Sequence, residues 1–297
     1  MDASLYWLGV FLAITSGCVN NIGLVFQKKV VNEVVAEEEK FFRNLVKKPL
    51  WITGLLMELA IGSIFFMLAQ VYIGPALIPG LMAFGLIFLA IGSVKIVSET
   101  LKKEEITGIL LMIIAIFLLG ISELSIDITN IDLLEIGLVF RMAIFTVTLF
   151  LGSILCEILQ RKSKKFKGIL LAISSGFQFS LTNFWIAPLM GVIAHIFGGT
   201  SSLGEFILFL CCVAILIVGS IIGIMKITQA FQVAQASNMI PIQQVPIQVT
   251  PVLFYFIVFM LAPPSFLSII YMSVGVIIIL ISSFLLSKRQ AQLEAIK

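Results

Sequence analysis

One carboxylate lies deep inside an otherwise apolar stretch of the sequence. Glu58 is eight residues into the apolar run 50–73, which places it about 12 Å from the start of a helix that rises 1.5 Å per residue. A carboxylate at such a depth in a bilayer is costly and is by default a functional residue. Three roles stay open for Glu58: a cation ligand, a proton relay, or a hydrogen-bond acceptor for Asn and Gln neighbours.

Neutral polar side chains gather in two further apolar stretches. Ser16 and Asn20 are four residues apart in the first stretch, and the second stretch carries polar residues at helical spacing, so each set occupies one helix face. The second set consists of Ser175, Gln178 and Thr182, with Asn183 directly after it. Because unpaired polar groups are costly in hydrocarbon, these faces predict a shared polar cavity. Close helix packing through small residues is the alternative, which we favour for the Ser and Thr residues but not for the amides.

Amide side chains also accompany a run of prolines in a late apolar segment. Asn238 and Gln243 lie at its start, and Pro241, Pro246 and Pro251 are spaced five residues apart. Each proline removes a backbone donor, so the spacing predicts a discontinuous helix with freed carbonyl groups. Such carbonyl groups bind ions and substrates in carriers. A continuous helix with a kink is the alternative.

These polar residues lie in a chain with the composition of an integral membrane protein. Of its 297 residues, 60% are hydrophobic and 12% are charged, and the mean hydropathy is +1.15. A soluble domain carries about 25% charged residues and a disordered chain has few aromatic residues, so both classes are excluded. The four cysteines, Cys18, Cys156, Cys211 and Cys212, lie in apolar stretches, which indicates core residues and no disulfide framework.

Nine apolar segments are long enough to cross a bilayer, which takes about 20 residues. The predicted fold is therefore all-α, a polytopic membrane protein with nine transmembrane helices. The segments are 5–27, 50–73, 76–98, 106–124, 136–159, 168–191, 204–227, 239–262 and 265–287. The first segment has no basic stretch before it and is too long for a signal peptide, so we expect it to be retained.

The basic residues divide between the two sides of this arrangement. With nine spans, 18 of the 19 Lys and Arg residues fall on one side, and Arg141 is the exception. Since cytoplasmic loops carry the excess of Lys and Arg, we expect an outside N-terminus and a cytoplasmic C-terminus in the cell membrane. Residues 30–49 combine acidic and basic side chains, which predicts an amphipathic helix on the cytoplasmic surface.

Three sequence matches at nearly one offset indicate an internal duplication. The string GVFLAITSG at 9–17 recurs 159 residues later as GILLAISSG, and matches that begin at Gln70 and Met112 recur at offsets of 162 and 160. The predicted domains are a first four-helix repeat at 1–135, a linker helix with a basic loop at 136–165, and a second four-helix repeat at 166–290. Because five spans separate the copies, the repeats are inverted in the membrane, an arrangement typical of secondary carriers.

Enzyme motifs are missing from the sequence. It has a single histidine, His195, and contains no HExxH, CxxC, Walker or GxGxxG motif. No selectivity-filter sequence lies between the spans, which disfavours a channel. The basic residues are spaced by topology and do not form a nucleic-acid surface. We therefore expect no enzyme, no cofactor and no nucleic-acid partner.

Several short motifs are arranged as in a known transporter repeat. In the first half they are Trp51–Gly54, Pro75–Pro79, Leu86–Leu89 and Glu99–Gly108, the last followed by an apolar run. These motifs resemble the repeat of the drug/metabolite transporter (EamA-like) superfamily. Within it the chain is most similar to the NIPA magnesium transporters, whose first helix ends in a basic stretch like Gln27-Lys28-Lys29. The resemblance covers most of the chain and implies a helical membrane transporter.

The chain departs from this family at its carboxylate. Aligned on Gly54 and Pro79, the glutamate that those transporters usually carry in the second helix falls at Gly62. The carboxylate here is Glu58, one turn earlier on the same face. The second half also has Pro263-Pro264 where the family has an acidic cap.

Together with the resemblance, which implies magnesium as the cargo, these patterns predict a secondary carrier that works by alternating access on magnesium or another divalent cation. Glu58 is the expected metal ligand, because Mg²⁺ is bound by few carboxylates and retains water. The expected substrate pathway is Ser16, Asn20, Glu58, Ser175, Gln178, Thr182, Asn183, Asn238 and Gln243. The lipid bilayer is the expected surrounding, and a homodimer is left open.

Two other classes of function are weighed against this one. An exporter of small organic metabolites or drugs is favoured by an aromatic, nearly uncharged set of residues, which includes Trp185, Phe177, Phe179 and Tyr255. A receptor or scaffold without transport is disfavoured by the duplicated polar helices. The sequence leaves the cargo, its direction and the coupling ion open.

Overall fold

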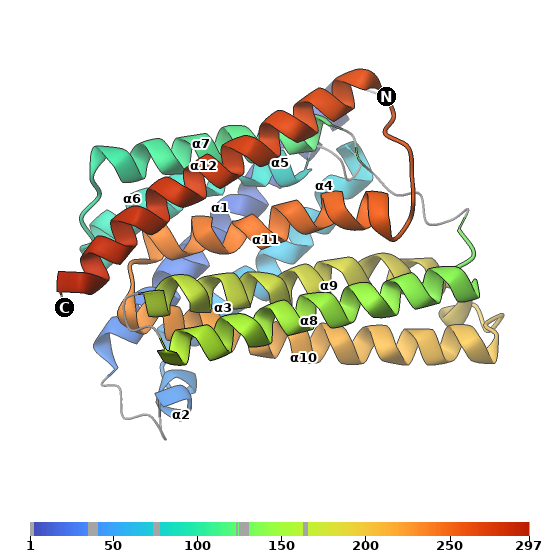
Figure 1. The fold of residues 1–297 in the computed structure, drawn as a ribbon, viewed down its shortest axis with the longest axis horizontal. Helices are drawn as coiled ribbons and strands as arrows, with labels where there is room; N and C mark the ends of the chain where they lie inside the picture. The colour runs from blue at the N-terminus through green and yellow to red at the C-terminus, as the bar shows by residue number, and fades with distance from the viewer. Residues whose placement is uncertain are drawn as a thin grey trace. The chain divides into compact units, whose positions relative to one another are not determined.

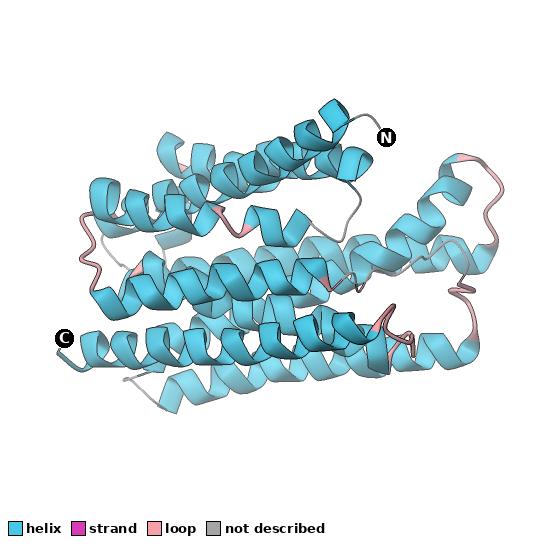
Figure 2. Ribbon diagram, turned by 90° about the horizontal axis from the view of Figure 1, so that it is seen from above, coloured by secondary structure: helices cyan, strands magenta, loops and turns pink. Residues whose placement is uncertain are grey.

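The computed structural model describes residues 3–34, 41–73, 78–122, 124, 131–162 and 166–296. Helices are the only regular elements among these residues (Figure 2). Nine of the described helical segments are long and apolar enough to cross a bilayer, which confirms the predicted all-α polytopic membrane protein. The segments are Leu5–Glu33, Pro49–Ala69, Gly80–Val97, Lys103–Ile121, Ile136–Lys162, Lys167–Phe197, Leu203–Val233, Ala236–Ile257 and Phe266–Lys288.

The chain forms two compact units. The first holds Met1–Leu124, Thr228–Ile242 and Pro263–Lys297, and the second holds Ser125–Ile227 and Gln243–Ala262. The helices that lie wholly in the first unit are α1 (Ala3–Glu33), α2 (Phe41–Val46), α3 (Pro49–Leu56), the π-helical turn η1 (Met57–Ile61), α4 (Gly62–Ile73), α5 (Ile78–Met82), α6 (Gly85–Val97), α7 (Lys103–Ile121) and α12 (Phe266–Ile296).

Helix α1 is the centre of the first unit and contacts α3, η1, α4, α5 and α6. Its glycines permit these contacts. A Cβ atom on Gly17 would overlap the carbonyl oxygen of Met82, and one on Gly23 would collide with the carbonyl oxygen of Gly54. Small residues let membrane helices approach closely enough for backbone contact. Glycine spacing on α1 thus fixes where the second and third spans lie along it.

Helices α7 and α12 run side by side in the same unit (Figure 1). Their seam also depends on small residues. The Ser282 hydroxyl donates a 2.6 Å hydrogen bond to the carbonyl oxygen of Gly108, and a Cβ atom on Gly275 would lie 3.1 Å from the carbonyl oxygen of Ala115. These contacts seat the last helix of the chain along most of α7.

The second unit contains α8 (Ile136–Lys162), α9 (Lys167–Phe197), most of α10 (Leu203–Val233) and the later part of α11 (Ala236–Ile257). Helices α8 and α9 lie side by side (Figure 1) and are joined by a 2.9 Å hydrogen bond between the hydroxyls of Ser153 and Ser174. An aromatic core fills this unit. Its rings, in edge-to-face or tilted contact, are Phe145, Phe184, Trp185, Phe254 and Phe259.

The predicted helix break at the start of the eighth span is wrong. Helix α11 is continuous from Ala236 to Ile257 and contains all three of its prolines. The break lies in the third span instead, where Ala83 and Phe84 form a turn between α5 and α6. The near contact of Gly17 with Met82 lies directly before this turn. A single missing donor every five residues leaves enough hydrogen bonds to continue a helix.

The predicted surface helix at residues 30–49 takes a different form in the described residues. Helix α1 continues to Glu33, and Phe41–Val46 forms the short separate helix α2. In α2, Phe41 and Leu45 are buried and Arg43 is exposed, so this piece has the expected amphipathic character. Residues 35–40 of the predicted helix lie outside the described part of the chain.

Candidate functional site

Glu58 lies in η1, the one π-helical turn of the described helices. Single π turns inside α-helices are frequent at functional sites. The Gln27 amide donates a 2.7 Å hydrogen bond from Nε2 to Oε2 of Glu58. Gln27 is completely buried, whereas Glu58 is half-buried. The carboxylate therefore has a fixed neutral partner on α1 and retains open coordination positions.

Gly62 and Asn20 lie next to this pair. Gly62 has no side chain, and a Cβ atom there would overlap Oδ1 of Asn20. The Asn20 amide oxygen therefore occupies the space that a side chain at Gly62 would need. The Ser16 hydroxyl donates a 2.7 Å hydrogen bond to the carbonyl oxygen of Gly62, which holds α4 against α1 at the same level.

Two amide oxygens of this cluster have no hydrogen-bond partner within the described chain. They are Oδ1 of Asn20 and Oε1 of Gln27, and both atoms are buried. Buried polar atoms are almost always satisfied in folded proteins, so each exception asks for an explanation. Both side chains lie on one face of α1, seven residues apart, and both face the η1–α4 segment.

A carboxylate with two unsatisfied amide oxygens is a set of hard oxygen donors. Such donors bind Mg²⁺ and Ca²⁺, and Mg²⁺ uses only one or two carboxylates because it keeps several waters. Within the described residues there is no group of three or more His, Cys, Asp or Glu side chains that could hold a metal ion. The oxygen atoms of Asn20, Gln27 and Glu58 are thus of the chemical type that binds a partly hydrated cation.

The polar face of α9 forms a second group, in the other unit. The Ser175 hydroxyl donates to the carbonyl oxygen of Gly223 at 2.7 Å and accepts from Nε2 of Gln243 at 2.8 Å. Gln178 and Thr182 are buried beside Gly219, where a Cβ atom would overlap the Thr182 methyl group. Asn183 is exposed and so does not share this buried face.

Asn238 belongs to a third group, which also lies within the first unit. Its amide donates a 2.8 Å hydrogen bond to Oε1 of Glu105, and both side chains are completely buried. Glu99 is nearby in sequence and binds the start of α11. Its carboxylate accepts hydrogen bonds from the backbone amides of Ala236 and Ser237 at 2.7 and 3.2 Å, and from the Ser237 hydroxyl at 2.7 Å.

A buried lysine completes the third group. The Lys28 ammonium donates to the carbonyl oxygens of Phe231 and of Ala234, the latter at 2.7 Å. These carbonyls lie at the end of α10, where a helix dipole favours a cation, just as the start of α11 favours the Glu99 carboxylate. Two opposite charges, Lys28 on α1 and Glu99 in the loop between α6 and α7, thus hold the α10–α11 elbow, residues 232–237.

The comparisons with known proteins agree with the resemblance seen in the sequence. The profile of a protein family described as "Magnesium transporter NIPA" matches residues 4–292. The chain belongs to this family. It is therefore a member of a transporter family and of the drug/metabolite transporter superfamily. No curated protein sequence and no solved structure matches the chain.

The Asn20 side chain leaves no space for the glutamate that the resemblance to the NIPA transporters places at position 62. A glutamate at position 62 would collide with the Asn20 amide, because even a Cβ atom has no space there. The Glu58 carboxylate instead accepts a 2.7 Å hydrogen bond from the Gln27 amide. On the second span, Gly62 thus accommodates the Asn20 amide of α1, and Glu58, one turn earlier, meets the Gln27 amide of α1.

Sequence reasoning missed several residues of these groups. Gln27 was attributed to the basic stretch that ends the first span, although its spacing of seven from Asn20 places both on one face. Glu99 and Glu105 entered only as part of a family motif. The sequence does show three carboxylates directly after the third span, Glu99, Glu104 and Glu105. The structure adds that Glu99 and Glu105 are buried.

Proposed function

We propose that this protein transports Mg²⁺ and that Glu58, Gln27 and Asn20 form its cation site. The observation that carries the proposal is the hydrogen bond from Gln27 to Glu58, together with the two buried amide oxygens that have no partner. Membership in the NIPA family supports the same cargo. The site offers one negative charge and neutral oxygens, so bound Mg²⁺ would keep part of its water shell.

Two inverted repeats that move against each other are the proposed means of transport. Corresponding contacts support the duplication: Ser16 bonds to the carbonyl oxygen of Gly62 at 2.7 Å, and Ser175, 159 residues later, bonds to that of Gly223 at the same distance. A Cβ atom on Gly176 would meet the carbonyl oxygen of Gln243, as one on Gly17 would meet that of Met82. The proposed domains remain 1–135, 136–165 and 166–290, and the architecture is that of secondary carriers.

The remaining expected pathway residues are proposed as the uncharged part of the route. Ser175, Gln178, Thr182 and Gln243 are buried in the second unit and offer hydroxyl and amide groups. Asn238 is engaged by Glu105 and so has a structural role in the elbow group, while Asn183 is exposed. Neither of these two is retained as a ligand.

The proposed location is the cell membrane, with the N-terminus outside and the C-terminus in the cytoplasm. The partition of Lys and Arg between the loops supports this orientation. The elbow group of Lys28, Glu99 and Glu105 would then lie toward the cytoplasmic side, because it follows the first and third spans.

The aromatic residues named for the organic-solute alternative take part in packing contacts. Trp185 is buried and donates a 2.9 Å hydrogen bond from Nε1 to the Thr146 hydroxyl. Tyr255 is also buried and donates to the carbonyl oxygen of Ala262 at 2.7 Å. Phe177 packs against Gly152, and Phe179 packs against Gly223. These four aromatic side chains serve packing, so an aromatic binding site is not proposed.

Flux of Mg²⁺ into vesicles tests the proposal. We expect purified protein in vesicles that enclose a Mg²⁺-sensitive dye to admit Mg²⁺, and Glu58→Gln to abolish this flux while the protein still folds. The matched control is Glu104→Gln, which removes an exposed carboxylate outside the site and is expected to leave flux unchanged. Wild-type flux at the level of empty vesicles would exclude Mg²⁺ as cargo. Unchanged flux in Glu58→Gln would exclude Glu58 as the ligand.

A further inference from the structure

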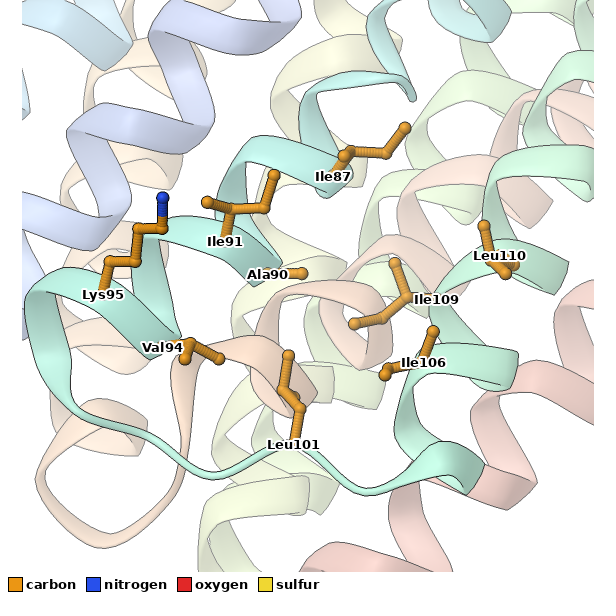
Figure 3. A pocket seen from close by; sticks show the side chains of 9 residues that line it. All are labelled: Ile87, Ala90, Ile91, Val94, Lys95, Leu101, Ile106, Ile109 and Leu110. Atoms are coloured by element: carbon orange, nitrogen blue, oxygen red, sulfur yellow. The ribbon is translucent and has the colours of Figure 1, made fainter.

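A groove lies between the later part of α6 and the start of α7 (Figure 3). Its volume is about 360 Å³, within the range of small-molecule and lipid-tail sites. The residues that line it are Ile87, Ala90, Ile91, Val94, Lys95, Leu101, Ile106, Ile109 and Leu110. Apart from Lys95, every one of these side chains is aliphatic.

The groove opens toward the outer surface of the first unit. Ile91, Val94 and Leu110 are between 44% and 50% exposed, while Ile109 is only 3% exposed and forms the base. Both helices are long and apolar enough to cross a membrane, and in a bilayer the exposed aliphatic face of a span contacts hydrocarbon. An apolar groove in that position can accommodate a hydrocarbon chain.

The length of the groove matches one leaflet. From Ile87 to Lys95 the α6 wall covers nine residues, and the eight steps between them rise about 12 Å at 1.5 Å per residue. Half of a hydrocarbon core is about 15 Å. One acyl chain of a lipid in the leaflet next to the α6–α7 loop can therefore lie along the groove for most of its depth.

Positive charge is concentrated at one end of the groove. Lys95 contributes its aliphatic stem to the wall, and its nitrogen lies at the edge of the group of side chains (Figure 3). Lys102 and Lys103 are exposed in the adjoining loop and first helical turn. Of the neighbouring acids, Glu104 is exposed, whereas Glu99 and Glu105 are buried and bind the α11 segment. The exposed groups at this end carry a net positive charge.

The loop between α6 and α7, residues 98–102, is fixed by its own hydrogen bonds. Ser98 has a left-handed backbone (φ 61°), and the Glu99 amide donates to the carbonyl oxygen of Ser93 at 2.9 Å. The Lys102 amide donates to Oε2 of Glu105 at 2.7 Å, which starts α7. Leu101, between these two contacts, is thereby held in the wall of the groove.

We propose that the α6–α7 groove binds an anionic phospholipid, with one acyl chain in the groove and the phosphate at Lys95, Lys102 and Lys103. Basic residues between membrane helices on the cytoplasmic side recognise anionic head groups. The long lysine stems extend along apolar surface and bring their charge to the head-group level. This site is separate from the Glu58 cluster and does not depend on the cargo.

Lipid retention by native mass spectrometry tests the head-group contacts. Full-chain protein in detergent is titrated with dioleoylphosphatidylglycerol, dioleoylphosphatidylcholine or glycerol phosphate. We expect the anionic lipid to bind more tightly than the zwitterionic one and glycerol phosphate not to bind.

The lysine variants test the head-group contacts one by one. Each of Lys95→Gln, Lys102→Gln and Lys103→Gln should lower the affinity for the anionic lipid about fivefold. Lys48→Gln, an exposed lysine at the start of another span, is the control and should change nothing. Equal affinity for both phospholipids would overturn the proposal.

A second substitution tests the acyl-chain contacts. Ala90→Trp fills the groove, whereas Ala143→Trp adds the same side chain to an exposed position of α8. We expect only Ala90→Trp to lower binding of both phospholipids, by at least tenfold for the anionic one. Size-exclusion profiles confirm folding of each variant. Binding that is unaffected by Ala90→Trp would show that the lipid lies elsewhere, and the lysine variants decide the question if Ala90→Trp does not fold.

Discussion

The Glu99 carboxylate allows a quantitative test of what holds the α10–α11 elbow. Its two oxygens accept three hydrogen bonds, from the amides of Ala236 and Ser237 and from the Ser237 hydroxyl, and Glu99 is only 8% exposed. In Glu99→Gln one oxygen becomes an NH₂ group that faces a donor. At least one buried N–H then has no acceptor, and the helix start loses its negative charge.

The size of the effect follows from these two losses. An unsatisfied buried donor costs about 1–3 kcal/mol, and a charge at a partly buried helix terminus contributes up to about 2 kcal/mol. We expect Glu99→Gln to lower the local opening free energy of the elbow by about 3 kcal/mol, which corresponds to roughly a hundredfold change in an equilibrium constant.

Hydrogen exchange followed by mass spectrometry measures this opening. Amides in peptides that cover Gln235–Met239 should exchange about a hundred times faster in Glu99→Gln than in the wild type, in the regime where exchange reports the opening equilibrium. Glu104→Gln, in the same loop region but exposed, should leave these amides unchanged. Equal exchange in Glu99→Gln and the wild type would refute the assignment of Glu99 as the group that fixes the elbow.

Two further predictions concern the cation cluster and the topology. Gly62→Ala should destabilise the protein by about 1–3 kcal/mol, because its Cβ overlaps Asn20 Oδ1. The double variant with Asn20→Ala should recover most of this loss, as measured by chemical denaturation. Additive effects of the two substitutions would show that the two residues do not meet. In a cysteine-free background, Thr200→Cys should react with an impermeant reagent added outside, and Lys48→Cys should react only after permeabilisation. Labelling of Lys48→Cys from outside would contradict the proposed orientation.

Much of this fold could be predicted from sequence because membrane spans are set by a simple length and polarity rule. All nine predicted segments correspond to the nine spans, since each is a long apolar run. The helix break could not be predicted in the same way. Three prolines marked α11, but the turn at Ala83–Phe84 lies opposite Gly17, and that backbone contact is decided by tertiary packing.

The cluster around Glu58 was only half accessible from sequence. Depth in an apolar run singled out the carboxylate, and helical spacing singled out Ser16 and Asn20. The role of Gln27 depends on which face of the second span meets α1, and a π turn alters that face by changing the local residues per turn. Sequence alone also does not show that Asn183 is exposed, because its neighbour Thr182 lies on the buried side of α9.

If the chain is built from the two proposed repeats, the contacts of Ser16 and Ser175 are duplicated but the charge of Glu58 is not. Glu58 corresponds to Gly219 and Asn20 to Phe179 at the repeat offsets, so only one half of the chain has the carboxylate. Loaded with Mg²⁺, a site with one carboxylate has a net charge of +1, and empty it has −1. Without a counter-ion, the loaded step carries one positive charge inward and the empty step returns one negative charge outward, so each cycle moves the two charges of Mg²⁺, and an inside-negative potential of about 100 mV favours inward transport by about 4.6 kcal/mol per cycle. Such a carrier would generate current and would follow the membrane potential as well as the concentration of its cargo.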